Sequence, residues 1–349
     1  MPATGGSWAS GGAPTGGGAG GTPANGGGPS GGGGGAGGRA PGGGGAGGGS
    51  GGSVGCSKDC GGGACASGKC QPLELASDGS GPVAIALDDT YVYWASYLTG
   101  VKRVSKQGGS VEAIATGQAY AIALDANSVY WIDTAGSGGD VKKAAKAPGA
   151  TPTTLAAAEP GASSGLAVAN GWVYWTTSTE IRRAPTGGGT ASAAVSNLTA
   201  ARFVAIAPSG APVWIEYPGQ NQGVIATLQN GNRVELATGQ ADPHRLAIDG
   251  ATVYWANHYG GKVMSVPLAG GGPATPLSSW SGNPMALAVD ADNVWFTNDN
   301  AGEIRVVPKT GGTTSVVADM QGVPQALAID ANFVYWASNS GGAVMKLAK

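Results

Sequence analysis

The sequence contains little charge, few histidines and no long apolar run. Lys and Arg number 19 against 21 Asp and Glu, so the formal net charge is -2. A chain with this balance has no electrostatic attraction to nucleic acid or to acidic membranes, and we expect neither as a partner. No run of 18 or more apolar residues is present. We therefore expect no transmembrane segment.

The first 55 residues almost lack apolar side chains. They hold 29 of the 67 glycines and a single charged residue, Arg39. Such a composition cannot offset the backbone entropy of ordering, so we predict that residues 1–55 form a disordered Gly/Ala/Ser-rich linker. The start M-P-A-T-G-G-S-W has neither the basic residues nor the apolar stretch of a signal peptide.

Cysteine is absent except in C-S-K-D-C-G-G-G-A-C-A-S-G-K-C at residues 56–70, where it occupies Cys56, Cys60, Cys65 and Cys70. The Gly and Lys around these thiols offer no apolar packing. We predict a small disulfide-bonded segment of an oxidising compartment, with three connectivities open. A zinc site is the alternative, disfavoured because the spacing lacks C-x-x-C. An extracytoplasmic location would require a signal peptide upstream of Met1, which we state as an expectation.

The rest of the chain repeats one unit. The stretch A-I-A-L-D-D-T-Y-V-Y-W-A from Ala84 returns six more times with altered spelling. Each copy has a Val anchor, and successive anchors are 37, 44, 40, 40, 41 and 40 residues apart: Val92, Val129, Val173, Val213, Val253, Val294 and Val334. This is the period of a four-stranded propeller blade. We predict an all-β, seven-bladed β-propeller of antiparallel blades.

A large side chain ends the V-Y-W run of each copy and should pack between blades. We assign this position to Trp94, Trp131, Trp175, Ile215, Trp255, Phe296 and Trp336. The seventh copy stops after its third strand, whereas residues 71–77, Q-P-L-E-L-A-S, precede the first blade. We predict that residues 71–77 supply the missing strand and close the ring. The domains expected are the linker at 1–55, the Cys-rich segment at 56–70 and the propeller at 71–349.

The pattern A-[IL]-A-[ILV]-D followed by V-Y-W resembles the YWTD propellers of lipoprotein receptors and the related NHL propellers. Tyr130 to Asp133, Y-W-I-D, comes closest to the name-giving motif. The Cys-rich segment after a Gly-rich linker resembles bacterial secreted or surface lipoproteins of the myxobacterial kind. More distantly, V-W-F-T at Val294 to Thr297 resembles streptogramin lyase propellers. Receptor propellers have six blades and this chain has seven copies, so their ligand specificity is not carried over.

An aspartate follows the inner strand in five copies: Asp88, Asp125, Asp249, Asp290 and Asp330. A carboxylate ring of this kind could bind a metal. However, each aspartate stands at a turn, where its side chain can accept local backbone N–H bonds. We therefore predict turn caps, and we expect no metal site and no cofactor.

Ligands of propellers usually bind the face made by loops that enter the inner strands and loops that link the second and third strands. We predict a ligand-binding face composed of Tyr97, Tyr120, Asp133, Arg202, Tyr217, His244, Arg245, His258, Tyr259, Asn298 and Asp299. Both histidines of the chain fall on this face within one repeat. Coincidence and a binding or metal role both remain open for them.

No catalytic motif accompanies this face. The G-x-S-x-G strings, as at Gly161 to Gly165, and the other Gly-rich strings lie in the linker or between strands rather than before a helix, so a nucleophile elbow and phosphate loops are excluded. We expect a monomeric, non-enzymatic, extracytoplasmic binding or scaffold propeller that recognises a protein or glycan. The alternative is a streptogramin-lyase-like enzyme that uses a metal and His. Against it, Asn298 stands where such an enzyme could use an acidic residue after Thr297.

Overall fold

In a computed structural model, the described residues are 56–77, 79–135, 138–162, 164–278 and 282–349. Within these ranges the chain forms strands and no helix, and accordingly no helix long and apolar enough to cross a membrane. The linker predicted at residues 1–55 lies outside the described residues.

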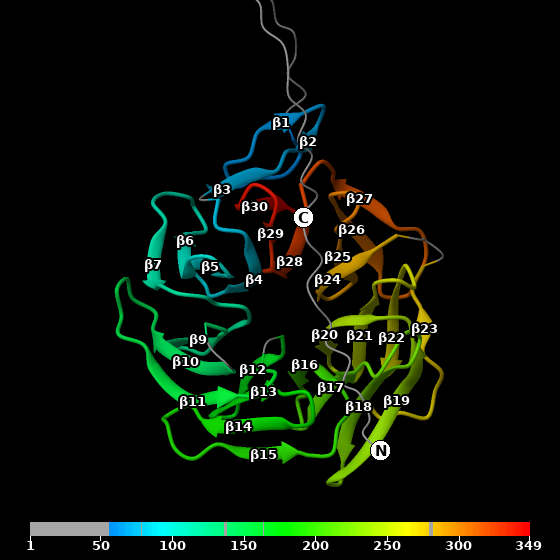
Figure 1. The fold of residues 1–349 in the computed structure, drawn as a ribbon. Helices are drawn as coiled ribbons and strands as arrows, with labels where there is room; N and C mark the ends of the chain where they lie inside the picture. The colour runs from blue at the N-terminus through cyan, green and yellow to red at the C-terminus, as the bar shows by residue number, and fades with distance from the viewer. Residues whose placement is uncertain (1–55, 78, 136–137, 163, 279–281) are drawn as a thin grey trace, which may run out of the picture. The chain divides into compact units, whose positions relative to one another are not determined.

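The described residues form seven four-stranded antiparallel sheets arranged around a common axis (Figure 1), which confirms the predicted propeller. We number the blades 1 to 7 in chain order. The strands of each blade are given from the innermost outward. Blade 1 contains β4 (Pro82–Leu87), β5 (Tyr91–Ser96), β6 (Gly100–Ser105) and β7 (Glu112–Ala115); blade 2 contains β8 (Ile122–Leu124), β9 (Ser128–Asp133), β10 (Gly139–Ala145) and β11 (Thr153–Glu159); blade 3 contains β12 (Leu166–Ala169), β13 (Trp172–Thr176), β14 (Ile181–Pro185) and β15 (Ser192–Val195). Blade 4 contains β16 (Ala201–Ile206), β17 (Pro212–Glu216), β18 (Gly223–Gln229) and β19 (Asn232–Gln240); blade 5 contains β20 (Pro243–Asp249), β21 (Thr252–Asn257), β22 (Lys262–Pro267) and β23 (Thr275–Pro276); blade 6 contains β24 (Pro284–Val289), β25 (Asn293–Asn298), β26 (Glu303–Pro308) and β27 (Ser315–Ala318).

Blade 7 joins the two ends of the propeller sequence. It consists of β28 (Pro324–Ile329), β29 (Phe333–Ser338), β30 (Ala343–Ala348) and, as its outermost strand, β3 (Leu73–Ser77). The blue β3 lies beside the red β30 in Figure 1, with Ser77 opposite Ala343. The predicted closing strand is therefore confirmed.

The main hydrophobic clusters lie between neighbouring blades. Val92 and Trp94 of blade 1 pack against Tyr335 of blade 7. Tyr93, which points to the other side of the same strand, packs against Trp131 of blade 2. This alternation explains the continuous apolar runs, because both faces of each blade are covered by a neighbour.

Blade 4 departs from the predicted register. Trp214 lies opposite Val204, just as Trp255 of blade 5 lies opposite Leu246. The large side chain between blades 3 and 4 is therefore Trp214, and the assignment of Ile215 to this position was wrong. The paired residues Val204 and Trp214 are ten positions apart and Leu246 and Trp255 are nine apart, so the blade 4 hairpin has one extra residue, which shifts the copy.

Four of the five recurrent aspartates cap turns, as predicted. One carboxylate oxygen of each accepts backbone N–H bonds of 2.7 to 3.1 Å from the residues two and three further along; this holds for Asp88, Asp125, Asp290 and Asp330. Three of these carboxylates also contact a lysine of the next blade: Lys146 with Asp88, Lys349 with Asp290, and Lys106 with Asp330. The fifth, Asp249, contacts Lys309.

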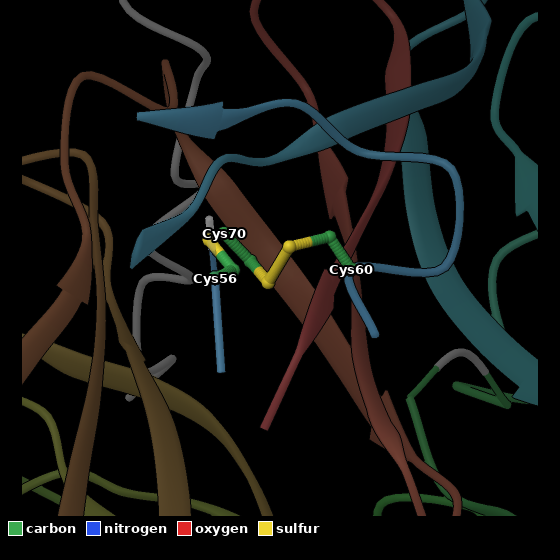
Figure 2. Close-up of side chains that lie close together, drawn as sticks. All are labelled: Cys56, Cys60 and Cys70. Atoms are coloured by element: carbon green, nitrogen blue, oxygen red, sulfur yellow. A yellow bond between two sulfur atoms is a disulfide. The ribbon is translucent and has the colours of Figure 1, made fainter. Parts of the chain in front are cut away.

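The Cys-rich segment forms the small hairpin β1 (Cys65–Ala66) and β2 (Lys69–Cys70), with disulfides Cys56–Cys65 and Cys60–Cys70. Figure 2 shows the sulfur atoms of Cys56, Cys60 and Cys70 close together. Cys70 is buried in a cluster with Leu347 of blade 7. The segment is therefore packed against the closing blade.

Candidate ligand-binding site

A cavity of ≈ 240 Å³ lies where the inner strands of the blades begin, and we call it the axial cavity. All seven blades contribute to its lining through an inner strand or the loop entering it. The lining residues are Val83, Tyr120, Ser164, Arg202, Phe203, His244, Arg245, Met285 and Gln325. The lining is mostly apolar, with a few polar groups and two guanidinium groups, as is common for ligand sites.

A repeated proline positions part of this lining. Four inner strands begin with proline, namely Pro82, Pro243, Pro284 and Pro324. The next residue of each strand lines the axial cavity: Val83, His244, Met285 and Gln325. This recurring Pro is a sequence signal that could have identified Val83, Met285 and Gln325, which we did not predict.

Two irregular positions lie on the cavity in adjacent blades. Phe203 and Arg245 have positive φ angles of 31° and 49°, and each lies at a register shift between the first two strands of its blade. The Arg245 guanidinium lies 5.0 Å from the centroid of the Phe203 ring. Non-glycine residues rarely adopt such angles, and strain of this kind tends to occur at functional sites.

Asp242 is the centre of an ionic network beside the cavity, and sequence reasoning missed it. Its side chain is buried, with 8% exposed. One carboxylate oxygen lies 3.3 Å from Arg202 Nη1. The other lies 3.3 Å from His244 Nε2 and 3.5 Å from His258 Nδ1. The two histidines of the chain thus share one carboxylate.

His258 has a second acidic neighbour. Its Nε2 lies 3.3 Å from Asp299 Oδ2, and this hydrogen bond raises the pKa of His258 above its ordinary value, against the effect of burial. The ring packs between His244, at 5.3 Å, and Tyr259, at 4.9 Å between centroids. His258 is therefore the histidine that gains a proton more readily.

His244 is held in the neutral form. Burial is the main cause that lowers the pKa of His244 to about 4. With its proton on Nε2, which faces Asp242, the ring keeps a lone pair on Nδ1. That Nδ1 atom is buried and has no hydrogen-bond partner in the described part of the chain.

Arg245 differs from Arg202 in lacking an acidic partner. Its Nη2 donates a hydrogen bond of 3.2 Å to the carbonyl oxygen of Val83 in blade 1. Among the described residues, no carboxylate lines the cavity or forms an ion pair with Arg245. Burial lowers the pKa of Arg245, yet a guanidinium stays charged at neutral pH. The cavity therefore holds a positive charge without a carboxylate counter-ion.

The structure brings most of the predicted face together. Tyr120, Arg202, His244 and Arg245 line the cavity. The Asp242 network extends to His258, Tyr259, Asp299 and Tyr217, whose ring lies 4.6 Å from the Arg202 guanidinium carbon. Tyr97 contacts the Tyr120 ring edge-on, at 6.4 Å between centroids.

Two predicted residues lie apart from the cavity. Asp133 forms an ion pair of 2.7 Å with Lys142 in blade 2. Asn298 is buried in blade 6, where its Nδ2 donates to Glu303 Oε2 at 2.8 Å. Both side chains are engaged within their own blades.

The acidic and histidine side chains of the network do not form a ready metal site. Within the described ranges, the only three His, Cys, Asp or Glu side chains whose ligand atoms all lie within 4.8 Å of one another are the disulfide-bonded Cys56, Cys60 and Cys70.

The sequence matches no protein-family model and no curated protein. Solved structures share the fold at low identity. Virginiamycin B lyase from Staphylococcus aureus is 16% identical with a TM-score of 0.64, over 80% of this chain and 98% of the lyase. The WD40 propeller domain of Doa1 is 14% identical with a TM-score of 0.65, over 79% and 96%. Nidogen, in a complex with laminin, is 20% identical with a TM-score of 0.52, over 63% and 89%.

These neighbours comprise both enzymes and binding proteins, so their likeness is one of fold and leaves the function open. For the lyase, a variant in which alanine replaces a histidine is catalytically inactive and was solved with quinupristin.

Proposed function

We propose that this chain is a non-enzymatic binding propeller that holds a protein or glycan ligand on the face around the axial cavity. The observation that carries the proposal is Arg245, a charged group at the point where all seven blades converge, with no carboxylate partner among the described residues. Arg245 is partly buried, and charges removed from water that serve only structure are normally paired.

The surroundings of the cavity support a binding role. Three tyrosines on this face are exposed: Tyr97 by 46%, Tyr120 by 41% and Tyr259 by 68%. Exposed aromatic side chains with a polar tip are enriched at interfaces, because they supply contact area at a low entropy cost. A ligand that enters the cavity would also contact this aromatic rim.

We further propose an extracytoplasmic, secreted or surface-tethered monomer, as the resemblance to bacterial lipoproteins implies. The two disulfides support an oxidising compartment. In this proposal the Gly-rich residues 1–55 act as a spacer between the surface and the propeller.

The test is retention of the purified protein on the protein and polysaccharide fractions of its native envelope. Tyr97→Ala with Tyr259→Ala should weaken retention about tenfold or more, the usual loss at an aromatic hot spot. Val316→Ala is the matched control, because Val316 is 45% exposed on the outermost strand of blade 6. Equal retention of both variants and the unaltered protein would count against a ligand on this face.

A lyase is the second candidate, and one observation favours it. His244 lies 3.3 Å from a carboxylate and is neutral at physiological pH, which is the state a general base requires. Incubation with quinupristin, followed by mass spectrometry, discriminates the two candidates. Cleavage that disappears in His244→Ala would replace the binding proposal, whereas an intact substrate retains it.

A further inference from the structure

We infer that the axial cavity binds the carboxylate of a sugar acid, and that Arg245 is the partner of that carboxylate. This inference rests on the proposed binding function and names the chemical class of its ligand.

The charge of the cavity is unbalanced. Arg202 has Asp242 at 3.3 Å, but the one hydrogen bond made by Arg245 among the described residues is to the neutral carbonyl of Val83. A guanidinium has five N–H donors, so one carbonyl leaves most of them available. Enclosing a charge without a partner is costly, and an anion from outside would remove that cost.

The anion that suits the cavity is a carboxylate rather than a phosphate. A guanidinium presents two parallel N–H groups to a carboxylate, which is the preferred geometry for this pair. A phosphate dianion fits less well. The Asp242 carboxylate lies 3.3 Å from both Arg202 and His244, so it would repel a second negative charge and already neutralises one of the two guanidinium groups.

The volume and lining of the cavity indicate what else the ligand contains. The volume of ≈ 240 Å³ lies below the range of roughly 300 to 1,000 Å³ found for drug-sized ligands, so it suits one small ring. Ser164 and Gln325 offer hydrogen bonds to hydroxyl groups, and Met285 and Phe203 offer apolar contact. A carboxylate on a hydroxylated ring, as in a hexuronic acid, satisfies both the charge and the polar groups.

The aromatic rim allows two sources of this chemistry. A free sugar acid could occupy the cavity alone. A uronic acid at the end of a polysaccharide could occupy it while the next sugars contact the exposed Tyr97 and Tyr120.

The experiment titrates the full chain with sodium glucuronate and, as the neutral analogue, with glucose. We expect glucuronate to bind at least about tenfold more tightly than glucose, since a charge-assisted bond separates them. Arg245→Gln should weaken glucuronate binding about tenfold to a hundredfold and leave glucose binding unchanged. Arg245→Lys, which keeps the charge but loses the planar fork, should give an intermediate loss.

The matched control is Lys309→Gln. This substitution also removes one positive charge, and Lys309 contacts Asp249 at the far end of the strand that carries Arg245. Thermal melting checks that all variants are folded. An oligogalacturonate that binds more tightly than the monomer indicates a polysaccharide source, and equal affinities indicate a free acid; either result supports the inference.

The inference is overturned if glucose binds as tightly as glucuronate, if Arg245→Gln behaves like Lys309→Gln, or if inorganic phosphate displaces glucuronate at a lower concentration than glucuronate itself requires. If no sugar acid binds while envelope retention still depends on Tyr97 and Tyr259, the inference fails and the binding function stands. If retention is also independent of these tyrosines, both fail.

Discussion

At the scale of single residues, the pKa values of the two histidines shift in opposite directions, although both rings contact the same carboxylate. His258 gains a hydrogen bond to Asp299, and its pKa is raised. For His244, burial outweighs the attraction of Asp242, and its pKa falls to about 4. The positive charges of His258, Arg202 and Arg245 act in the same direction as burial.

This difference predicts how stability depends on pH. The unfolded chain protonates His244 near 6.5, whereas the folded chain keeps it neutral down to about 4. Stability from His244 is therefore complete above pH 6.5 and is lost as the pH falls toward 4, by a total of about 3 kcal/mol. Urea unfolding of the unaltered protein and His244→Gln between pH 7 and pH 4 measures this loss.

The comparison separates His244 from its neighbour. The stabilisation from His258 has the opposite sign: it is complete below pH 6.5 and is lost as the pH rises through its raised pKa. Because both proteins contain His258, its effect largely cancels in the difference. If that difference stays constant from pH 7 to pH 4, the neutral state of His244 is refuted.

The residues of the cavity were only partly predictable from the sequence. Loops entering the inner strands could be located from the repeats, so Arg202, His244 and Arg245 were found. Asp242 precedes Pro243 and was overlooked because no repeat places an acidic residue before that proline elsewhere. The positive φ angles of Phe203 and Arg245 could not be anticipated, since glycine and asparagine are the usual sequence signals for them.

At the scale of the elements, an aspartate combines a turn cap with a contact between blades in three blades, through Asp88, Asp290 and Asp330. Asp330 accepts N–H bonds from Asn332 and Phe333. Its other oxygen accepts from the Tyr335 hydroxyl and from Lys106 Nζ of blade 1, both at 2.9 Å. The same carboxylate thus fixes the turn, the second strand and the neighbouring blade.

Asp330→Ala should therefore lower the free energy of unfolding by about 2 to 4 kcal/mol, because it removes a cap and leaves the Tyr335 hydroxyl and Lys106 without their acceptor. Asp249→Ala provides the matched control. The Asp249 side chain is 49% exposed and pairs only with Lys309 among the described residues, so its removal should cost less than about 1 kcal/mol. If the two substitutions lower the free energy of unfolding equally, the turn cap of Asp330 and its contacts with Tyr335 and Lys106 stabilise the fold no more than an exposed ion pair does.

The strands could be predicted from the sequence wherever the copies of the repeat keep the same residues. The V-Y-W and V-W-F copies with a preceding Asp or, in blade 3, Asn170 placed six blades in the correct register. In blade 4 the copy A-I-A-P-S-G-A-P-V-W-I lacks this Asp and has a longer turn, so aligning its V-W-I with the V-Y-W of the other copies gave a register one residue off. Trp214, fully buried, was consequently assigned one position away from its place.

At the scale of the whole molecule, stability depends on the joint between the two ends of the propeller. Lys346 of β30 is 1% exposed, and its ammonium donates at 2.9 Å to the carbonyl oxygens of Lys106 in blade 1 and Gly61 in the Cys-rich segment. Burial lowers the pKa of Lys346, but the carbonyl oxygens satisfy its donors. One side chain therefore connects the closing blade to the first blade and to the disulfide-bonded segment.

Removing the closing strand should destabilise the whole ring. A chain that begins at residue 78 loses the pairing of β3 with β30 and the buried Leu75 and Ala76, which pack against Val92 and Trp94 of blade 1. At roughly 2 to 4 °C per kcal/mol for a domain of this size, the loss should lower the melting temperature by about 10 °C or more. Deleting residues 1–52, which have almost no apolar side chains, should leave it unchanged.

A point substitution separates the strand from the disulfides that the truncation also removes. Leu75→Ala keeps all four cysteines and the strand pairing but empties a position that is 5% exposed, at a cost of about 2 to 4 kcal/mol. Its melting temperature should therefore lie between those of the full chain and the chain that begins at residue 78. If Leu75→Ala and the deletion of residues 1–52 both melt with the full chain, β3 pairs with blade 7 without stabilising the closed ring.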